Sequence, residues 1–99
     1  MSAGTIRAIV LDKKDNVATA MSNLKGGDII TVSIEDYTDN ISLSQDIPFG
    51  HKFALQNIHR GGAIVKYGEI IGRARNNIGK GEHTHVHNVE GLRGRGDKR

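Results

Sequence analysis

Short runs of β-favouring residues alternate with glycine-containing turns along most of the chain. The runs are rich in Val, Ile and Thr, and the glycines between them are typical of strands joined by tight turns. No repeat of fixed period is evident. The pattern predicts a mainly β domain with strands near residues 5–12, 28–34, 40–44, 52–57, 63–67, 70–74 and 83–88.

One segment breaks this pattern and predicts a short helix. Val17, Met21 and Leu24 recur at the i, i+4 and i+7 positions of one helix face. Asp15 precedes them in the position of an N-cap, and a glycine pair follows as a stop signal. We therefore expect one short helix that packs on a sheet, with Asp15 and Asn16 serving as capping residues rather than catalytic groups.

The net charge of +3 comes from the carboxyl-terminal end of the chain. Residues 91–99 carry four basic groups and one acid, whereas residues 1–90 carry ten of each. The chain contains two Phe, two Tyr and no Trp, which argues against the basic, aromatic surface of nucleic-acid binding proteins. We interpret residues 1–90 as the folded domain and residues 91–99 as a basic flexible tail, and we expect no nucleic-acid partner.

Composition also restricts the compartment and the kind of metal site. No apolar run approaches the roughly 20 residues of a membrane span, and the opening residues lack the features of a secretory signal. The chain has no cysteine, so disulfides and thiolate ligands are excluded and any metal must be held by nitrogen and oxygen. We expect a cytoplasmic protein without membrane contact. Because a core at this length is thin, association with a larger partner or with itself is expected.

Three histidines alternate near the carboxyl-terminal end of the domain. His83, His85 and His87 would project from one side of a strand, with about 6.6 Å between successive members. Such a pattern permits a shared divalent ion, with a carboxylate such as that of Glu82 or a substrate oxygen completing the shell. Histidines packed at a subunit contact or exposed to solvent fit the spacing equally well. Asn88 faces the other way and is expected to close the strand end.

Two further positions combine cations with turns. His51 and Lys52 follow a Pro-Phe-Gly turn and offer a titratable base beside a cation. Lys66 and Tyr67 precede a glycine and offer a cation that can pair with a carboxylate substrate. Surface charges without a function account for either pair as well.

Four ordered motifs make the chain similar to a known family. Residues 15–20, 47–55, 65–74 and 83–88 resemble, in that order, the amino-terminal region of the altronate and galactarate dehydratases. The resemblance covers about residues 5–90 and implies a SAF domain, which has a β-clip fold. In this family the domain is fused to a larger catalytic portion or is encoded beside it as a small subunit, as in the related sulfolactate sulfo-lyase. The chain ends where the fused portion would begin, so we expect a small subunit with a large catalytic partner.

The resemblance implies a β-elimination of water from an anionic sugar acid with a divalent metal, typically iron(II). For this reaction, the resemblance makes His51 and Lys52 the candidate catalytic groups and Lys66 and Tyr67 the candidate substrate contacts. The candidate metal ligands are His85 and His87, with His83. We expect no turnover from this chain alone. Two other classes of function stay open: a binding module for a sugar acid or a protein, and a purely structural small subunit. Elimination of sulfite instead of water is a further alternative within the lyase class.

Overall fold

A computed structural model describes residues 6–91 of the chain, and within this range it contains strands and turns but no helix. The expected mainly β architecture is therefore confirmed, and it agrees with a SAF β-clip. No helix in the described range is long and apolar enough to cross a membrane. The strands are β1 (Ala8–Ile9), β2 (Val17–Ala20), β3 (Ile29–Ile34), β4 (Tyr37–Ser42), β5 (Lys52–Ala54), β6 (Ala63–Lys66), β7 (Glu69–Ala74), β8 (His83–Thr84) and β9 (Val89–Gly91).

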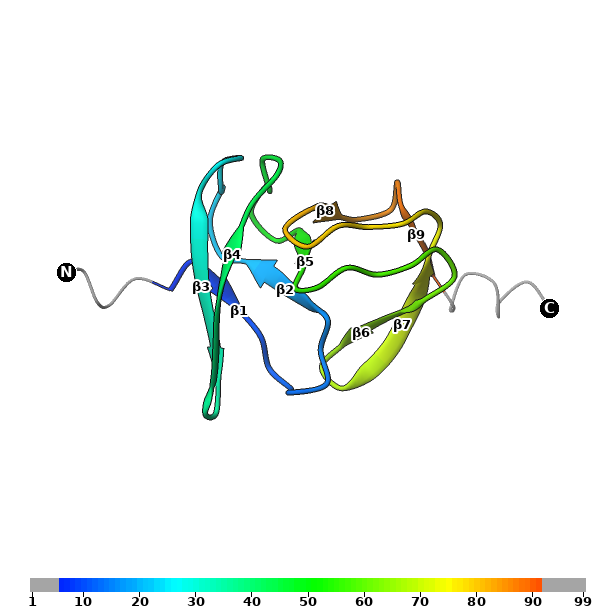
Figure 1. Cartoon of the computed structure of the whole chain (residues 1–99), viewed down its shortest axis with the longest axis horizontal. Helices are drawn as coiled ribbons and strands as arrows, with labels where there is room; N and C mark the ends of the chain where they lie inside the picture. Colours follow the sequence, from blue (N-terminus) through cyan, green and yellow to red (C-terminus); the bar gives the residue numbers. More distant parts are fainter. Residues whose placement is uncertain (1–5, 92–99) are drawn as a thin grey trace.

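The strands form three small antiparallel sheets. The central sheet has the order β1-β2-β5-β8, and it joins strands that are far apart in the sequence. The β3–β4 hairpin lies at one end of the molecule, and the sheet β6-β7-β9 lies at the other (Figure 1). The central sheet thus connects the two ends and carries β5 and β8 side by side.

The predicted helix is wrong, because residues 17–20 form strand β2. This strand lies between β1 and β5, and three of its four side chains are buried, so both of its faces pack in the interior. A strand buried on two faces loses the polar–apolar alternation that marks a strand in the sequence. Leu24 forms a separate bridge to Ile47. Tertiary packing therefore overrides the local helical spacing.

Asp15 and Asn16 also act differently from the predicted helix caps. The Asp15 carboxylate accepts a hydrogen bond from the backbone N–H of Gly68 (2.8 Å). The Asn16 side chain accepts from the N–H of Val65 (2.8 Å) and donates to the carbonyl of Ala63 (2.9 Å). Through these hydrogen bonds, Asp15 and Asn16 hold the β6–β7 hairpin against the start of β2.

Two groups of buried apolar residues form the interior. One lies around β1, β2, β3 and β4 and includes Phe53, Ile30 and Ile41. The other lies around β6 and β7 and includes Ile64 and Ile78. Strand β2 places Val17 in the second group and Ala18 in the first, and β5 places Ala54 in the second and Phe53 in the first. Both strands therefore contribute to both cores.

The same type of turn occurs four times along the chain, but the turns are unevenly spaced, so the sequence shows no period. In each, a buried aliphatic residue is followed three positions later by a glycine with positive φ, a backbone conformation that glycine adopts without strain. The aliphatic residues are Leu24, Ile47, Ile58 and Ile78, and the glycines are Gly27 (φ 95°), Gly50 (φ 84°), Gly61 (φ 85°) and Gly81 (φ 86°).

The four turns associate in two pairs. Leu24 bridges Ile47, and Ile58 bridges Ile78. In each pair, the side chain just before each of the two aliphatic residues accepts a hydrogen bond from a backbone N–H of the partner turn. These bonds join Asn23 to Phe49, Asp46 to Gly26, Asn57 to Lys80 and Asn77 to Arg60, at 2.8–2.9 Å. Two of the turns lead directly into β5 and β8, so they fix where these strands begin.

Most of the other strand predictions hold. Residues 28–34 and 63–67 contain β3 and β6, and β7 begins one residue before the predicted 70–74. The strands predicted at 5–12 and 52–57 are shorter, since only β1 and β5 form there. The sharp turn expected after Pro48 is present at Gly50. The strand predicted at residues 40–44 begins earlier, at Tyr37, because it pairs with the whole of β3. The division into a domain at residues 1–90 and a flexible tail at 91–99 stays a prediction, since residues 92–99 lie outside the described range.

Candidate functional site

Three histidines from two segments that are distant in the sequence meet beside the central sheet. His51 precedes β5, His83 begins β8, and β5 and β8 pair with Phe53 opposite His83. The Nδ1 atom of His51 lies 2.9 Å from the Nε2 atom of His83, within hydrogen-bond distance. The rings of His51 and His85 stack with centroids 3.8 Å apart and an angle of 13° between their planes. We call His51, His83 and His85 the histidine cluster.

The backbone around the histidine cluster is held from several sides. The N–H of His51 donates to the carbonyl of Pro48 (3.0 Å), and its carbonyl accepts from the N–H of Ala20 (2.8 Å). The N–H of His83 donates to the side-chain oxygen of Gln45 (2.9 Å). These bonds anchor two of the rings at the ends of paired strands.

The predicted strand at residues 83–88 is right only at its start, because β8 ends at Thr84 and a turn follows. Asn88 closes this turn, as expected for a residue at the strand end. Its buried side chain accepts from the N–H of His85 (2.9 Å) and donates to the carbonyl of His83 (2.9 Å). His85 therefore folds back toward His51 instead of continuing the strand.

The alternating arrangement expected for His83, His85 and His87 on one strand face is thus wrong. His87 lies in the turn and is exposed, with its ring centroid 5.0 Å from that of His83. The ring that joins His83 and His85 is that of His51, which stands 32 residues away in sequence from His83. Local spacing gave no signal for this contact.

Burial and neighbouring positive groups govern the electrostatics of the site. Burial, followed by the nearby His87, His51, His85 and Lys52, lowers the pKa of His83. Burial, followed by His51, Lys52 and His87, lowers the pKa of His85. Burial and the charge of Lys66 lower the pKa of Lys52. Besides burial, the groups that lower these three pKa values are histidines and lysines, and the lysines supply the positive charge of the site.

Lys66 and Tyr67 lie at the tip of the β6–β7 hairpin. Lys66 pairs with Glu69 across a two-residue turn, and Tyr67 (φ 56°) and Gly68 (φ 77°) both have positive φ. The Nζ atom of Lys66 lies 4.7 Å from the centroid of the Tyr67 ring, which is the geometry of a cation–π contact. The influence of Lys66 on Lys52 connects this hairpin to the histidine cluster.

The donor chemistry of the histidine cluster fits a divalent transition metal. One ring nitrogen from each of His51, His83 and His85 lies within 4.8 Å of the others. The Nδ1 atom of His85 is buried and has no hydrogen-bond partner in the described part of the structure. Glu82, the carboxylate that the sequence suggested as a further ligand, instead accepts from the N–H of Gly79 through Oε1 (2.8 Å).

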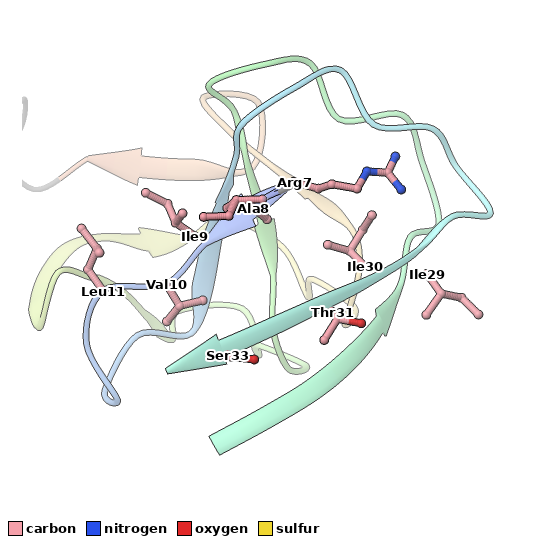
Figure 2. Close-up of a pocket in the computed structure, with 10 residues that line it drawn as sticks. Arg7, Ala8, Ile9, Val10, Leu11, Ile29, Ile30, Thr31 and Ser33 are labelled. Carbon is pink, nitrogen blue, oxygen red and sulfur yellow. The ribbon is translucent and has the colours of Figure 1, made fainter. Parts of the chain in front are cut away.

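A separate hollow of about 550 Å³ lies between the segment 6–11 and strand β3. Figure 2 shows its lining, which is mostly aliphatic. Ile6, Leu11 and Ile29 are exposed there. Arg7 is the charged residue of the lining, and it forms an ion pair with Asp28 (3.0 Å). The hollow contains none of the residues that the sequence singled out for chemistry.

The fold and the site together define a small β-clip domain with an open, nitrogen-rich face. A model of the SAF domain of altronate/galactarate dehydratases matches residues 6–92. The chain belongs to this family, and the resemblance inferred from its four motifs is confirmed.

Individual relatives fall into two kinds. The chain is 42% identical to an altronate dehydratase of Bacillus subtilis over 82 residues, and 45% identical to that of Escherichia coli over 75 residues. These matches cover 83% and 76% of the chain but only 16% and 14% of the dehydratases. The chain is also 34% identical over 89 residues to the alpha subunit of (2R)-sulfolactate sulfo-lyase of Chromohalobacter salexigens. This match covers 87% of the chain and 95% of that subunit.

Proposed function

We propose that this chain is the SAF component of a metal-dependent lyase that removes water from a hydroxylated carboxylic acid of the altronate or galactarate type. The observation that carries the proposal is the nitrogen-rich face formed by the histidine cluster with Lys52 and Lys66. Its lysines can bind an anion and its imidazoles can exchange protons, and Lys52 lies in the same strand pair as His83. The names of the relatives supply the class of reaction and substrate.

The elimination needs a base at one carbon and an acid at the hydroxyl of the neighbouring carbon. The base takes the proton α to the carboxylate, the electron pair forms the new double bond, and the β-hydroxyl leaves as water after receiving a proton. Lys52 and Lys66 would bind the carboxylate, with the Tyr67 ring beside Lys66, and His51 is the candidate for holding or moving a proton. A divalent metal, with iron(II) preferred by the family resemblance, would stabilise negative charge on the substrate oxygens.

This site needs a second component to enclose the substrate. The histidines and lysines lie at strand ends and at a hairpin tip. The hollow shown in Figure 2 is lined by other residues. Elimination proceeds best in a site from which water is excluded. A larger catalytic partner that covers the histidine cluster would provide this exclusion, and the isolated chain would then be inactive.

A second candidate is the small subunit of a sulfo-lyase. It is favoured by the match to the sulfolactate sulfo-lyase alpha subunit, 95% of which the chain covers. In that reaction sulfite leaves in place of water, and the binding of an anionic acid by Lys52 and Lys66 is unchanged. Measuring which leaving group is released separates the two candidates.

The test combines the full chain with the product of a neighbouring coding region that resembles the large subunit. Altronate, galactarate and sulfolactate are supplied separately, and the keto acid and the released sulfite are measured. We expect turnover only by the complex. His51→Ala should reduce kcat more than it reduces assembly, and Lys52→Met should raise KM by about tenfold or more, consistent with loss of a charge-assisted contact.

His59→Ala and Lys25→Met serve as matched controls, because both residues are exposed and lie outside the site. Turnover by the chain alone would contradict the shared site. Assembly without any elimination, together with binding of galactarate, would identify a binding module instead. Normal specific activity in the His51 and Lys52 variants would restrict the chain to a structural role.

A further inference from the structure

We infer that His51, His83 and His85 form a divalent transition-metal site contained within this chain. This goes beyond the proposed function, because a lyase of this kind can hold its metal entirely in the catalytic partner. It also replaces the proton-transfer role that the sequence and the proposed function give to His51. In this assignment His51 is a ligand and His87 is not.

The first support is the convergence of three imidazoles on anchored backbone. One nitrogen from each ring lies within 4.8 Å of the others, and two of the rings are already 2.9 Å apart between His51 Nδ1 and His83 Nε2. With metal–nitrogen bonds of about 2.0–2.1 Å, neighbouring ligand atoms on one ion stand roughly 3–3.5 Å apart. The spacing is therefore close to that of one metal site. Because the rings of His51 and His85 are stacked nearly parallel, they must rotate out of this stack to direct their lone pairs to one ion.

The second support is the buried Nδ1 atom of His85, which lacks a partner in the described structure. A buried polar nitrogen without a hydrogen bond costs about 1–3 kcal/mol, so the site is incomplete without a bound species. The backbone N–H of His85 is fixed by Asn88, which holds this residue against His51. A metal ion at the cluster would satisfy the nitrogen that the protein leaves open.

The donor set also indicates the kind of metal. Three imidazoles without a carboxylate suit Zn²⁺, Fe²⁺, Co²⁺ or Ni²⁺ and are poor ligands for Mg²⁺ and Ca²⁺, which prefer oxygen. Three protein ligands leave at least one coordination position open. Lys52 follows His51 and lies opposite Thr84 in the β5–β8 pair, so its positive charge stands close to the cluster and would favour an anionic oxygen as a fourth ligand.

The experiment measures metal binding by the full, tag-free chain without a partner. Co²⁺ is titrated by calorimetry and by visible absorption, with Mg²⁺ as the comparison ion. We expect one Co²⁺ per chain and no Mg²⁺ binding. His51→Asn, His83→Asn and His85→Asn should each weaken Co²⁺ binding by at least about tenfold, because even loss of a group that only supports a ligand commonly has this effect.

His59→Asn and His87→Asn are the matched controls, and both should bind Co²⁺ within about threefold of the unmodified chain. Both residues are exposed, and both are outside the donor group. A loss in His87→Asn equal to that in the cluster variants would overturn the assignment in favour of the set expected from spacing. Absence of Co²⁺ binding by the unmodified chain would overturn the site itself.

A second measurement does not depend on the folding of any variant. In the unmodified chain, Co²⁺ should shift and broaden the NMR signals of the His51, His83 and His85 rings most strongly and those of the His59 ring least. Equal broadening of all five histidines would indicate non-specific binding and overturn the proposal. Metal binding here with no lyase activity in any complex would leave this site standing and reject the proposed function.

Discussion

At the scale of single residues, several polar side chains point inward and hold the backbone in place through hydrogen bonds. Asn88, Asn16 and Asp15 are buried or half-buried, and each binds backbone groups. Asn88 binds those of its own turn, whereas Asn16 and Asp15 bind those of the distant β6–β7 hairpin. A buried side chain of this type costs stability unless its hydrogen bonds are made. These residues therefore decide where the histidine cluster and the β6–β7 hairpin lie.

The lowered pKa values of His83 and His85 predict acid sensitivity in the metal-free chain. A histidine whose pKa is lower in the folded state than the usual 6.5 takes up protons more readily when unfolded. Its contribution to stability is complete above about pH 6.5 and is lost as the pH falls toward the folded-state pKa. Unfolding by urea in the presence of a chelator should therefore show decreasing stability between pH 7 and 5.

Replacement of both histidines tests this pH dependence. His83→Gln combined with His85→Gln should flatten the decrease, whereas His59→Gln should leave it as in the unmodified chain, because His59 is exposed. An unchanged slope in the double variant would assign the acid sensitivity to other groups.

At the scale of elements, the two hairpins each contain a non-glycine residue with positive φ, Glu35 (φ 53°) between β3 and β4 and Tyr67 (φ 56°) between β6 and β7. This conformation costs roughly 1–2 kcal/mol for most residues and less for Asn. Only Tyr67 lies beside a cation of the proposed site. Strained residues concentrate at functional sites, so the same substitution should have different effects on function at the two turns.

Tyr67→Asn should change the free energy of unfolding by less than about 1 kcal/mol, since relief of strain offsets loss of the cation–π contact with Lys66. It should nevertheless raise the KM for the hydroxy acid in the complex severalfold. Glu35→Asn, the matched control, should stabilise the chain by up to about 1 kcal/mol without changing KM. Equal KM values for both variants would remove Tyr67 from the substrate site.

At the scale of the whole molecule, the central sheet connects the two ends and carries β5 beside β8. Gly81 lies where these ends meet, because its N–H donates to the carbonyl of Ala54 and its carbonyl accepts from the N–H of Ser44. A Cβ atom at Gly81 would overlap the carbonyl of Ser42, whereas one at Gly61 would meet nothing within 4 Å. The two glycines share the same φ region and differ only in surroundings.

This difference predicts unequal losses of stability. Gly61→Ala should cost about 1 kcal/mol through the backbone conformation alone. Gly81→Ala should cost at least about 3 kcal/mol, because the overlap is added to the same strain. Thermal and urea unfolding of both variants measures the difference, and equal losses would show that the contact between the two ends relaxes at little cost.

The sequence by itself determined the class of fold, the turn positions and the family. Glycine spacing and β-branched runs act over a few residues, and the four motifs stand in linear order, so both can be interpreted without a structure. The residues of the candidate site were also among those selected, namely His51, Lys52, Lys66, Tyr67 and the three histidines of residues 83–87.

Only the tertiary structure decided how these residues combine. It made residues 17–20 a strand, because burial between β1 and β5 outweighs helical spacing. It ended β8 at Thr84, because Asn88 captures the backbone of His83 and His85. It placed His51 against His83 and His85 through pairing of β5 with β8. Contacts between residues some 30 positions apart depend on the register of packed strands, which no local pattern specifies.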